Sequence, residues 1–133
     1  MSLEQFNFLL LIMAITGLVV FVALYFVEAG YGKMISDKWG PAINNKVAWV
    51  IMECPVFFVM LYLWGMSSRT FEVAPLAIFC IFQAHYFQRS FIFPFLLKGK
   101  SKMPITIMMM GFVFNLINGI IQGYWIFYLS PAD

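Results

Sequence analysis

Five consecutive residues, His85 to Arg89, place four polar side chains inside a long apolar segment of this sequence. A strongly polar side chain near the centre of a bilayer costs roughly 2.5 to 3.5 kcal/mol on insertion scales, so such groups usually face a protein interior and have a function there. Glu53 is a second polar anomaly, in the preceding apolar segment. Together these residues predict a functional site inside a membrane protein.

Glu53 and Tyr86 are the residues best suited to act on a carbonyl group. Burial in hydrocarbon disfavours the ionised form of a carboxyl group. A neutral carboxylic acid donates a hydrogen bond, as does the phenol of a tyrosine. Pro55 lies two residues after Glu53 and removes a backbone hydrogen bond, which opens room for a ligand beside the acid. An acid and a phenol in an apolar pocket predict recognition or chemistry of a lipid-like ketone.

Structural roles for the same residues compete with this interpretation. On the residues alone, an alternative of equal weight is that Glu53 pairs with Arg89 or His85 to hold two helices together. Arg89, eight residues before Leu97, also has the alternative of extending to the membrane interface. For Tyr86 the alternative is an interhelical hydrogen bond. A single histidine with these neighbours does not build a zinc site, so no metal is expected.

The last apolar segment carries a polar stripe and a set of glycines. The stripe consists of amide side chains at spacings of three and four, and the glycines allow another helix to approach closely: Asn115, Asn118 and Gln122, with Gly111, Gly119 and Gly123. Small-residue packing with interhelical amide hydrogen bonds explains this pattern by default. The functional alternative is that the stripe faces the cavity holding Glu53 and Tyr86.

Composition and segment lengths indicate the fold class. Hydrophobic residues make up 63% of the chain and charged residues 11%, whereas soluble domains have roughly 45 to 50% and about 25%. Continuous apolar runs without strict alternation disfavour a β-barrel. The sequence predicts an all-α, polytopic membrane helix bundle, with residues 1–133 as one domain. Because a bilayer core needs about 20 helical residues, the predicted transmembrane helices are residues 6–27, 47–66, 73–97 and 103–129.

The lysines occupy alternate connections between these four segments. By the positive-inside rule, both lysine-rich connections are expected in the cytoplasm, with both termini and the turn at 67–72 on the other side. Residues 98–102 could also bind anionic lipid or the phosphates of a nucleotide, although topology alone explains their charge. The expected location is an integral position in a bacterial inner membrane or the endoplasmic reticulum.

Four stretches resemble the membrane-embedded steroid 5α-reductase family, and they occur in the family's order: residues 30–33, 48–55, 85–96 and 118–124. The third stretch, followed by the basic connection, is the most specific. The resemblance implies an oxidoreductase of steroid or lipid metabolism. It implies NADPH-dependent reduction of the carbon–carbon double bond of a conjugated enone such as a 3-oxo-4-ene steroid.

The resemblance also implies roles for individual residues. The family's carbonyl-binding catalytic acid and tyrosine fall on Glu53 and Tyr86, whose hydrogen bonds would strengthen as the oxygen gains charge. Substrate-binding positions fall on Trp49, Phe114 and Tyr31, the last in a loop that closes over the site. Weaker cofactor-binding matches fall on Asn118 and Arg89. Some members carry glutamine where this chain has Met52, so contacts there are expected to differ.

Family members are about twice this length, with seven spans, and their C-terminal half supplies most NADPH-binding residues. The chain is therefore expected to correspond to the N-terminal, four-span half. It is either a portion of a longer enzyme or a short protein that requires a partner chain. The other expected partners are a hydrophobic steroid or isoprenoid substrate and membrane lipid, with no nucleic acid.

Two alternative functions stay open on the sequence. One is reduction of a polyprenol or an enoyl thioester by the same kind of protein. The other, of a different class, is a small four-helix transporter or lipid-binding membrane protein that uses Glu53 as a proton-coupled site.

Overall fold

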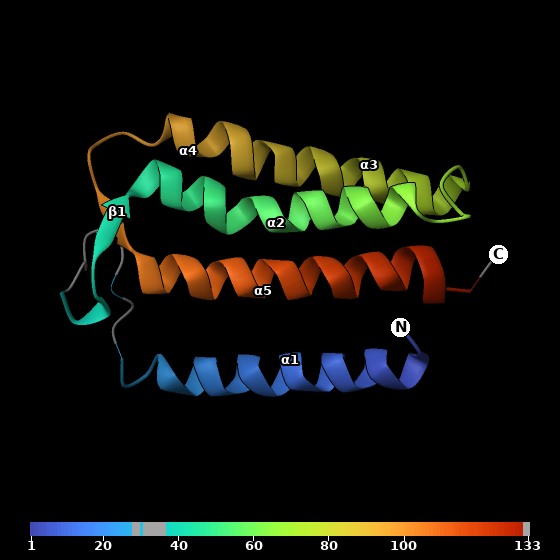
Figure 1. Cartoon of the computed structure of the whole chain (residues 1–133), viewed down its shortest axis with the longest axis horizontal. Helices are drawn as coiled ribbons and strands as arrows, with labels where there is room; N and C mark the ends of the chain where they lie inside the picture. Colours follow the sequence, from blue (N-terminus) through green and yellow to red (C-terminus); the bar gives the residue numbers. More distant parts are fainter. Residues whose placement is uncertain (28–29, 31–36, 132–133) are drawn as a thin grey trace.

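The chain is mostly helical in the computed structural model (Figure 1). Among the described residues, three helices are long and apolar enough to cross a membrane, and the mostly helical architecture confirms the predicted helical class. They are α1 (Leu3–Ala23), α2 (Asn45–Gly65), and α5 (Ile105–Tyr124) with a π-helical extension, Trp125–Leu129. The structure describes residues 1–27, 30 and 37–131.

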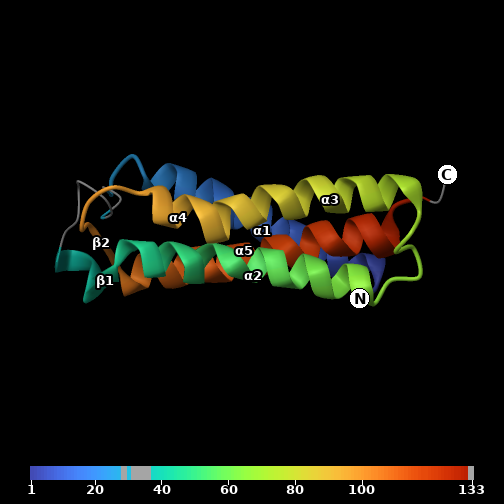
Figure 2. The same ribbon diagram turned by 90° about the horizontal axis from the view of Figure 1, so that it is seen from above.

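The segment expected as the third span is a composite rod. It consists of α3 (Val73–Phe87), a π-helical segment (Gln88–Ile92) and α4 (Phe93–Leu96). Seen from above in Figure 2, α3 and α4 continue in one direction beside α2. The α3 helix alone has 15 residues, fewer than the roughly 20 that cross a bilayer core. Three helices of the described residues are long and apolar enough to span, and the predicted third span is an interrupted rod, so the count of four spans stays a prediction.

The interruption has a local cause in Pro94, which lies in the first turn of α4. Proline has no backbone N–H, so it cannot donate the hydrogen bond that would continue a regular helix. The neighbouring Phe93 amide donates instead to the carbonyl of Gln88, five residues back. The resulting wide turn contains Arg89, and π-helical turns of this kind are frequent at functional sites.

Helices α2 and α5 form the main packing interface of the bundle, as the glycines on α5 predict. A methyl group at Gly119 would lie 3.2 Å from the Cα atom of Val56 on α2, a contact with backbone. Gly111 and Gly123 lie against side chains of α2 in the same way. Close approach of two helices at small residues is how membrane helices gain packing energy.

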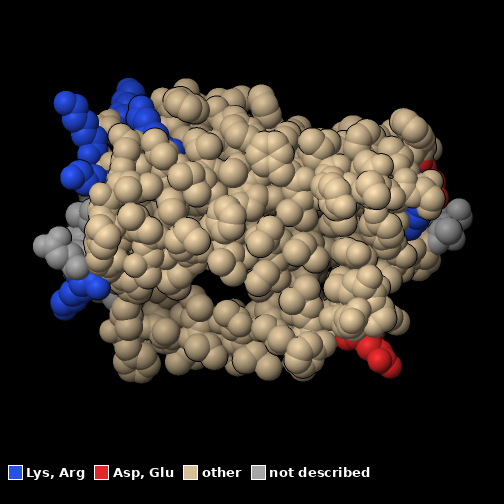
Figure 3. All heavy atoms as spheres, in the orientation of Figure 1, with Lys and Arg blue, Asp and Glu red and all other residues tan. Residues whose placement is uncertain are grey.

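A short antiparallel pair of strands joins the two lysine-rich connections. Strand β1 (Ala42–Asn44) pairs with β2 (Lys102–Pro104), with Ile43 opposite Met103. The expectation of an all-helical chain is wrong at this point. One physical reason is that a residue before proline, here Met103, is restricted to extended backbone. Lysines of both connections lie at one end of the bundle in Figure 3, as the alternating lysine pattern requires.

At the opposite end, Arg69 links the turn after α2 to the end of the chain. Its guanidinium donates to the hydroxyl of Ser130 at 2.8 Å and to the Ser130 carbonyl at 3.0 Å. It also pairs with Glu72 at 2.7 Å. Nearby, the Ser67 hydroxyl donates to the carbonyl of Phe127 at 3.1 Å.

Helix α1 lies at the edge of the bundle, beside α5 (Figure 1). Its first turn is closed by Ser2 and Gln5, each of which accepts a hydrogen bond from the other's backbone amide. Phe6 is buried and stacks on Trp125, with ring centroids 5.9 Å apart. Phe6 is the one buried residue of the helix. The rest of α1 is thus exposed or only partly covered.

Candidate functional site

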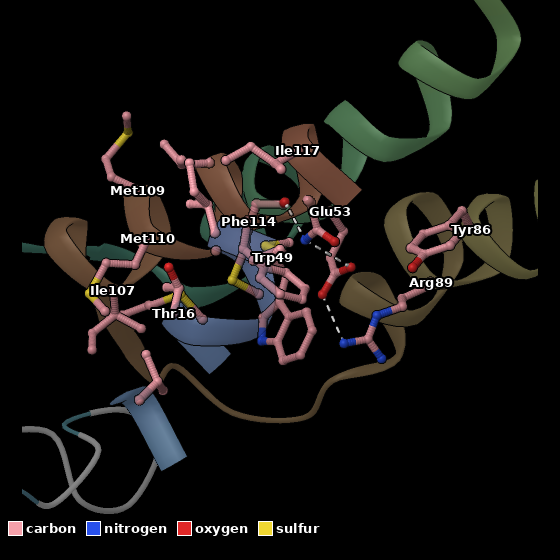
Figure 4. Close-up of a pocket in the computed structure, with 18 of the residues that line it drawn as sticks. Thr16, Trp49, Glu53, Tyr86, Arg89, Ile107, Met109, Met110, Phe114 and Ile117 are labelled. Atoms are coloured by element: carbon pink, nitrogen blue, oxygen red, sulfur yellow. Dashed lines mark hydrogen bonds and ion pairs between the residues drawn. The ribbon is translucent and has the colours of Figure 1, made fainter. Parts of the chain in front are cut away.

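The Glu53 carboxylate is buried on α2, with 3% of its surface exposed, and forms an ion pair across to the composite rod. One of its oxygens, Oε1, lies 2.8 Å from Nη2 of Arg89 (Figure 4). The pairing of Glu53 with Arg89, one of the structural alternatives, is thus present. This ion pair joins α2 to the composite rod at the level of the polar residues.

Arg89 is held on a second side by an aromatic ring. Its guanidinium carbon lies 5.3 Å from the centroid of the Trp49 ring, within the range of a cation–π interaction. Trp49 in turn contacts Phe93 edge to face, with centroids 5.5 Å apart. Trp49 stands one helical turn before Glu53, so α2 supplies both the carboxylate and the ring.

The other carboxylate oxygen of Glu53 faces α5. Asn115 is buried there, and its side-chain nitrogen lies 2.8 Å from the Met52 carbonyl oxygen and 3.4 Å from Oε2 of Glu53. Gly111, one turn before Asn115, lets the Met52 side chain pack against α5. The carboxylate is therefore contacted from two elements, the π-helical segment and α5.

Tyr86 lies one turn before Arg89, with its hydroxyl directed toward Glu53 (Figure 4). The Asn118 side-chain nitrogen donates to this hydroxyl at 3.5 Å. The Tyr86 ring contacts Phe82 at 4.6 Å and the ring of His85 at 5.0 Å between centroids. Because the hydroxyl oxygen accepts from Asn118, its own proton is available for another acceptor.

These polar groups form one corner of a cavity of about 960 Å³ between α1, α2, α5 and the composite rod, a size in the range of ligand sites. The remaining lining is almost entirely apolar and includes the methionines Met13, Met52, Met103, Met109 and Met110. Figure 3 shows the surface hollowed beside α1. The arrangement suits a hydrophobic ligand with one polar end.

Most of the predicted site residues come together here. Glu53, Tyr86, Trp49, Phe114 and Arg89 all line the cavity. Asn118 reaches it indirectly, through the Tyr86 hydroxyl. Tyr31 lies outside the described residues.

Of the other polar residues singled out in the sequence, some border the cavity and others lie away from it. His85 borders the cavity, whereas Gln88 is exposed. Of the stripe on α5, Asn115 faces the cavity, while Gln122 lines a smaller pocket against α1. The packing and the functional explanations of the stripe thus apply to different residues.

Sequence reasoning missed the part of the cavity wall that α1 supplies. Leu9, Met13 and Thr16 line the cavity. Their helix is apolar on all sides, so no amphipathic pattern marks the face that meets the ligand space. Thr16, one of the few polar residues of α1, is the one signal that could have pointed to that face.

Comparison with known proteins places these observations in a family. No family model matches the chain. Over 91% of its length it is 35% identical to steroid 5-alpha-reductase DET2 of Arabidopsis thaliana and 31% identical to the protein of that name from Gossypium hirsutum. Over 84% of its length it is 35% identical to 3-oxo-5-alpha-steroid 4-dehydrogenase 2 of Sus scrofa.

The chain spans about half the length of these relatives, 46% to 48% of each. The aligned part includes 84% to 91% of the chain. Its apolar helices fit the membrane nature of such proteins. The chain is thus an integral membrane protein that belongs, over the half that it spans, to the steroid 5-alpha-reductase family.

Proposed function

We propose that the chain takes part in reducing the conjugated carbon–carbon double bond of a 3-oxo-4-ene steroid or a related lipid enone, with the carbonyl oxygen polarised at Glu53 and Tyr86. The observation that carries this proposal is the placement of those two residues at the polar corner of a large apolar cavity. The names of the relatives support the same substrate class. Trp49 and Phe114 would line the bound ring system.

The cofactor of the proposed reaction is NADPH, which supplies a hydride when bound. Its phosphates require cationic partners. Among the described residues that line the cavity, Arg89 is the cation, and it is paired with Glu53. The described residues thus fit the enone and do not by themselves fit the whole dinucleotide. We propose Asn118 and Arg89 as this chain's neighbours of the cofactor.

The partner that completes the cofactor site is proposed to be a further membrane segment equivalent to the other half of the relatives. It would belong to a longer form of this protein or to a separate chain. The relatives' greater length supports this, since each is about twice as long as the region matched.

We further propose four membrane crossings, with the composite rod of α3 and α4 as the third. That rod and the three long helices lie side by side (Figure 1). The grouping of lysines at one end supports a cytoplasmic position for that end (Figure 3). The membrane would be a bacterial inner membrane or the endoplasmic reticulum.

The test is NADPH-dependent reduction of a 3-oxo-4-ene steroid by membranes that contain this chain or a longer natural reading frame. We expect activity that falls at least tenfold in Tyr86→Phe and in Glu53→Gln, and is unchanged in Gln88→Ala. Activity that persists in both site variants would refute the roles of these residues. Uptake of a ligand that depends on Glu53 and not on NADPH would instead support a transporter.

A further inference from the structure

We propose that the Thr16 hydroxyl on α1 binds a second polar group of the ligand, a hydroxyl or carbonyl oxygen at the end of the molecule remote from the enone. The inference rests on the proposed function, because it assumes that the enone oxygen lies at Glu53 and Tyr86. It narrows the proposed substrate class to lipid enones that carry an oxygen at both ends.

Thr16 lies on the one face of α1 that meets the cavity. The residues of α1 that line the cavity follow one another at helical spacings of three and four: Leu9, Ile12, Met13, Thr16 and Val20. Residues at these spacings share one side of a helix. Because Thr16 falls within this row, its side chain faces the ligand space.

The Thr16 hydroxyl has no partner in the part of the chain that the structure describes. The other polar residues of α1 lie near its start, at Glu4, Gln5 and Asn7. A threonine inside a helix can donate to the carbonyl four residues back, here that of Ile12, but no hydrogen bond joins the Thr16 hydroxyl to any described residue. A hydroxyl in an apolar environment without a hydrogen bond is unfavourable, so a ligand oxygen that bonds to it relieves that cost.

Thr16 stands apart from the other polar side chains of the cavity wall. Those others belong to the polar corner or adjoin it: Trp49, Glu53, His85, Tyr86, Arg89 and Asn115. Figure 4 shows Thr16 well away from Tyr86 and Arg89, with Trp49 and Phe114 drawn between them. A long ligand whose enone lies in the polar corner and whose body fills the cavity therefore presents its opposite end to α1.

The wall near that opposite end offers no other strong hydrogen-bonding side chain. It is lined by methionines, among them Met13, Met103 and Met110. Their flexible side chains adapt to the shape of a ligand, and a thioether is only a weak acceptor. Recognition of an oxygen at this end by a side chain of the described wall thus depends on Thr16, whose hydroxyl both donates and accepts.

The experiment compares the binding of two steroids that differ only at the far end, which needs no cofactor. The probes are androst-4-en-3-one and its derivative with a hydroxyl group on carbon 17. The affinity of each is measured with membranes that contain this chain or a longer natural reading frame, and membranes without it give the background. The measured quantity is the ratio of the two affinities, because the partition of each steroid between water and lipid then cancels when variants are compared.

The decisive variant is Thr16→Val, which replaces the hydroxyl with a methyl group and nearly keeps the shape of the side chain. We expect the preference for the hydroxylated steroid to fall about fivefold, as the loss of one neutral hydrogen bond implies. The affinity for androst-4-en-3-one should stay the same. Thr16→Ser keeps a hydroxyl and should keep the preference. Ile12→Val, on the same face of α1, is the matched control for shape and should alter both affinities alike.

The outcomes separate the inference from the proposed function. Tyr86→Phe should weaken both steroids alike, since both carry the enone. If it does so, but Thr16→Val leaves the ratio of affinities unchanged, the inference is wrong while the proposed function stands. If the ratio depends on Tyr86 and not on Thr16, the far end of the steroid lies in the polar corner, and the inference is overturned. If the unaltered protein binds neither steroid, both proposals are wrong.

A further variant covers the case in which Thr16→Val does not fold, as judged by circular dichroism. Thr16→Ala also removes the hydroxyl, and alanine is the residue that favours helix most. We expect the same fall in the ratio of affinities. A ratio equal to that of the unaltered protein in folded Thr16→Ala would refute the contact.

Discussion

At the scale of single residues, Asn115 contacts both a carboxylate of the site and the backbone of the helix that carries it. Its amide contacts both the Met52 backbone and the Glu53 carboxylate, and it is buried between α2 and α5. The residue therefore holds the helix that carries Glu53 and also the carboxylate itself. A buried polar group with two partners is costly to replace, because its partners lose a donor that water does not supply.

Asn115→Leu should consequently lower both stability and ligand affinity. We expect a loss of about 1 to 2 kcal/mol in the free energy of unfolding and a several-fold weaker affinity for the enone steroid. Denaturant titration followed by tryptophan fluorescence measures the first, and equilibrium binding the second. Gln122→Leu is the matched control, since Gln122 belongs to the same stripe but is exposed away from the site. Equal effects of the two substitutions would contradict a special role for Asn115.

At the scale of helices and turns, the contact of α2 with α5 sets the distance between Glu53 and its partners. Gly119 is the tightest backbone position of that interface, with Val56 Cα 3.2 Å from where a Cβ atom would lie. By contrast, nothing lies within 4 Å of the corresponding point at Gly17 on α1.

Gly119→Ala is expected to destabilise the chain by about 1 to 3 kcal/mol, because an added methyl in a closely packed interface forces the helices apart. Gly17→Ala should instead be neutral or slightly stabilising, since alanine favours helix. The measurement is the thermal transition of each variant in the same detergent. A Gly119→Ala variant as stable as Gly17→Ala would show that the interface can widen without cost.

The turn after α2 is tied to the end of the chain by Arg69, and this contact is also testable. Arg69→Gln removes donors to the backbone and hydroxyl of Ser130, so residues 125–131 should exchange amide hydrogens faster. Glu72→Gln, which removes the partner whose side chain is 46% exposed, should have little effect, since exposed ion pairs contribute about 0 to 1 kcal/mol. Unchanged exchange in Arg69→Gln would indicate that packing alone holds this end.

At the scale of the whole molecule, the two ends of the bundle differ in charge. Blue Lys and Arg side chains gather at the end with β1 and β2, and red acidic side chains lie at the other (Figure 3). The face between these two ends carries mostly uncharged residues, as a bilayer-spanning protein requires. This asymmetry is the physical basis of the proposed orientation.

The orientation predicts how cysteines introduced at the two ends react. The test uses a background with Cys54→Ala and Cys80→Ala. If the protein lies in a bacterial inner membrane, Ser68→Cys should be labelled by a membrane-impermeant maleimide in intact cells. If it lies in the endoplasmic reticulum, Ser68→Cys should be labelled in sealed microsomes only after lysis. Ser101→Cys should show the reverse pattern. Both serines are exposed, so failure to react reflects the membrane rather than burial. The opposite labelling would overturn the cytoplasmic assignment of the lysine end.

Much of the fold followed from the sequence because hydropathy and helix length are local properties. The ends of the helices near residues 23, 65 and 129 lie close to the predicted limits. Two features could not be predicted this way. The π-helical segment reflects Pro94 acting together with its surroundings, and the pairing of β1 with β2 joins residues 58 or more positions apart. Neither leaves a periodic signal.

The sequence by itself determined that Glu53, Tyr86 and Arg89 are polar groups in apolar helices, and the cost of burying them implied that they face one another. Only the tertiary structure decided how they are paired. The rotation of α2 against the composite rod places Arg89, rather than His85, at 2.8 Å from the carboxylate, and the approach of α5 brings Asn115 to its other oxygen. These distances depend on the relative rotation and spacing of three helices, which packing between them sets.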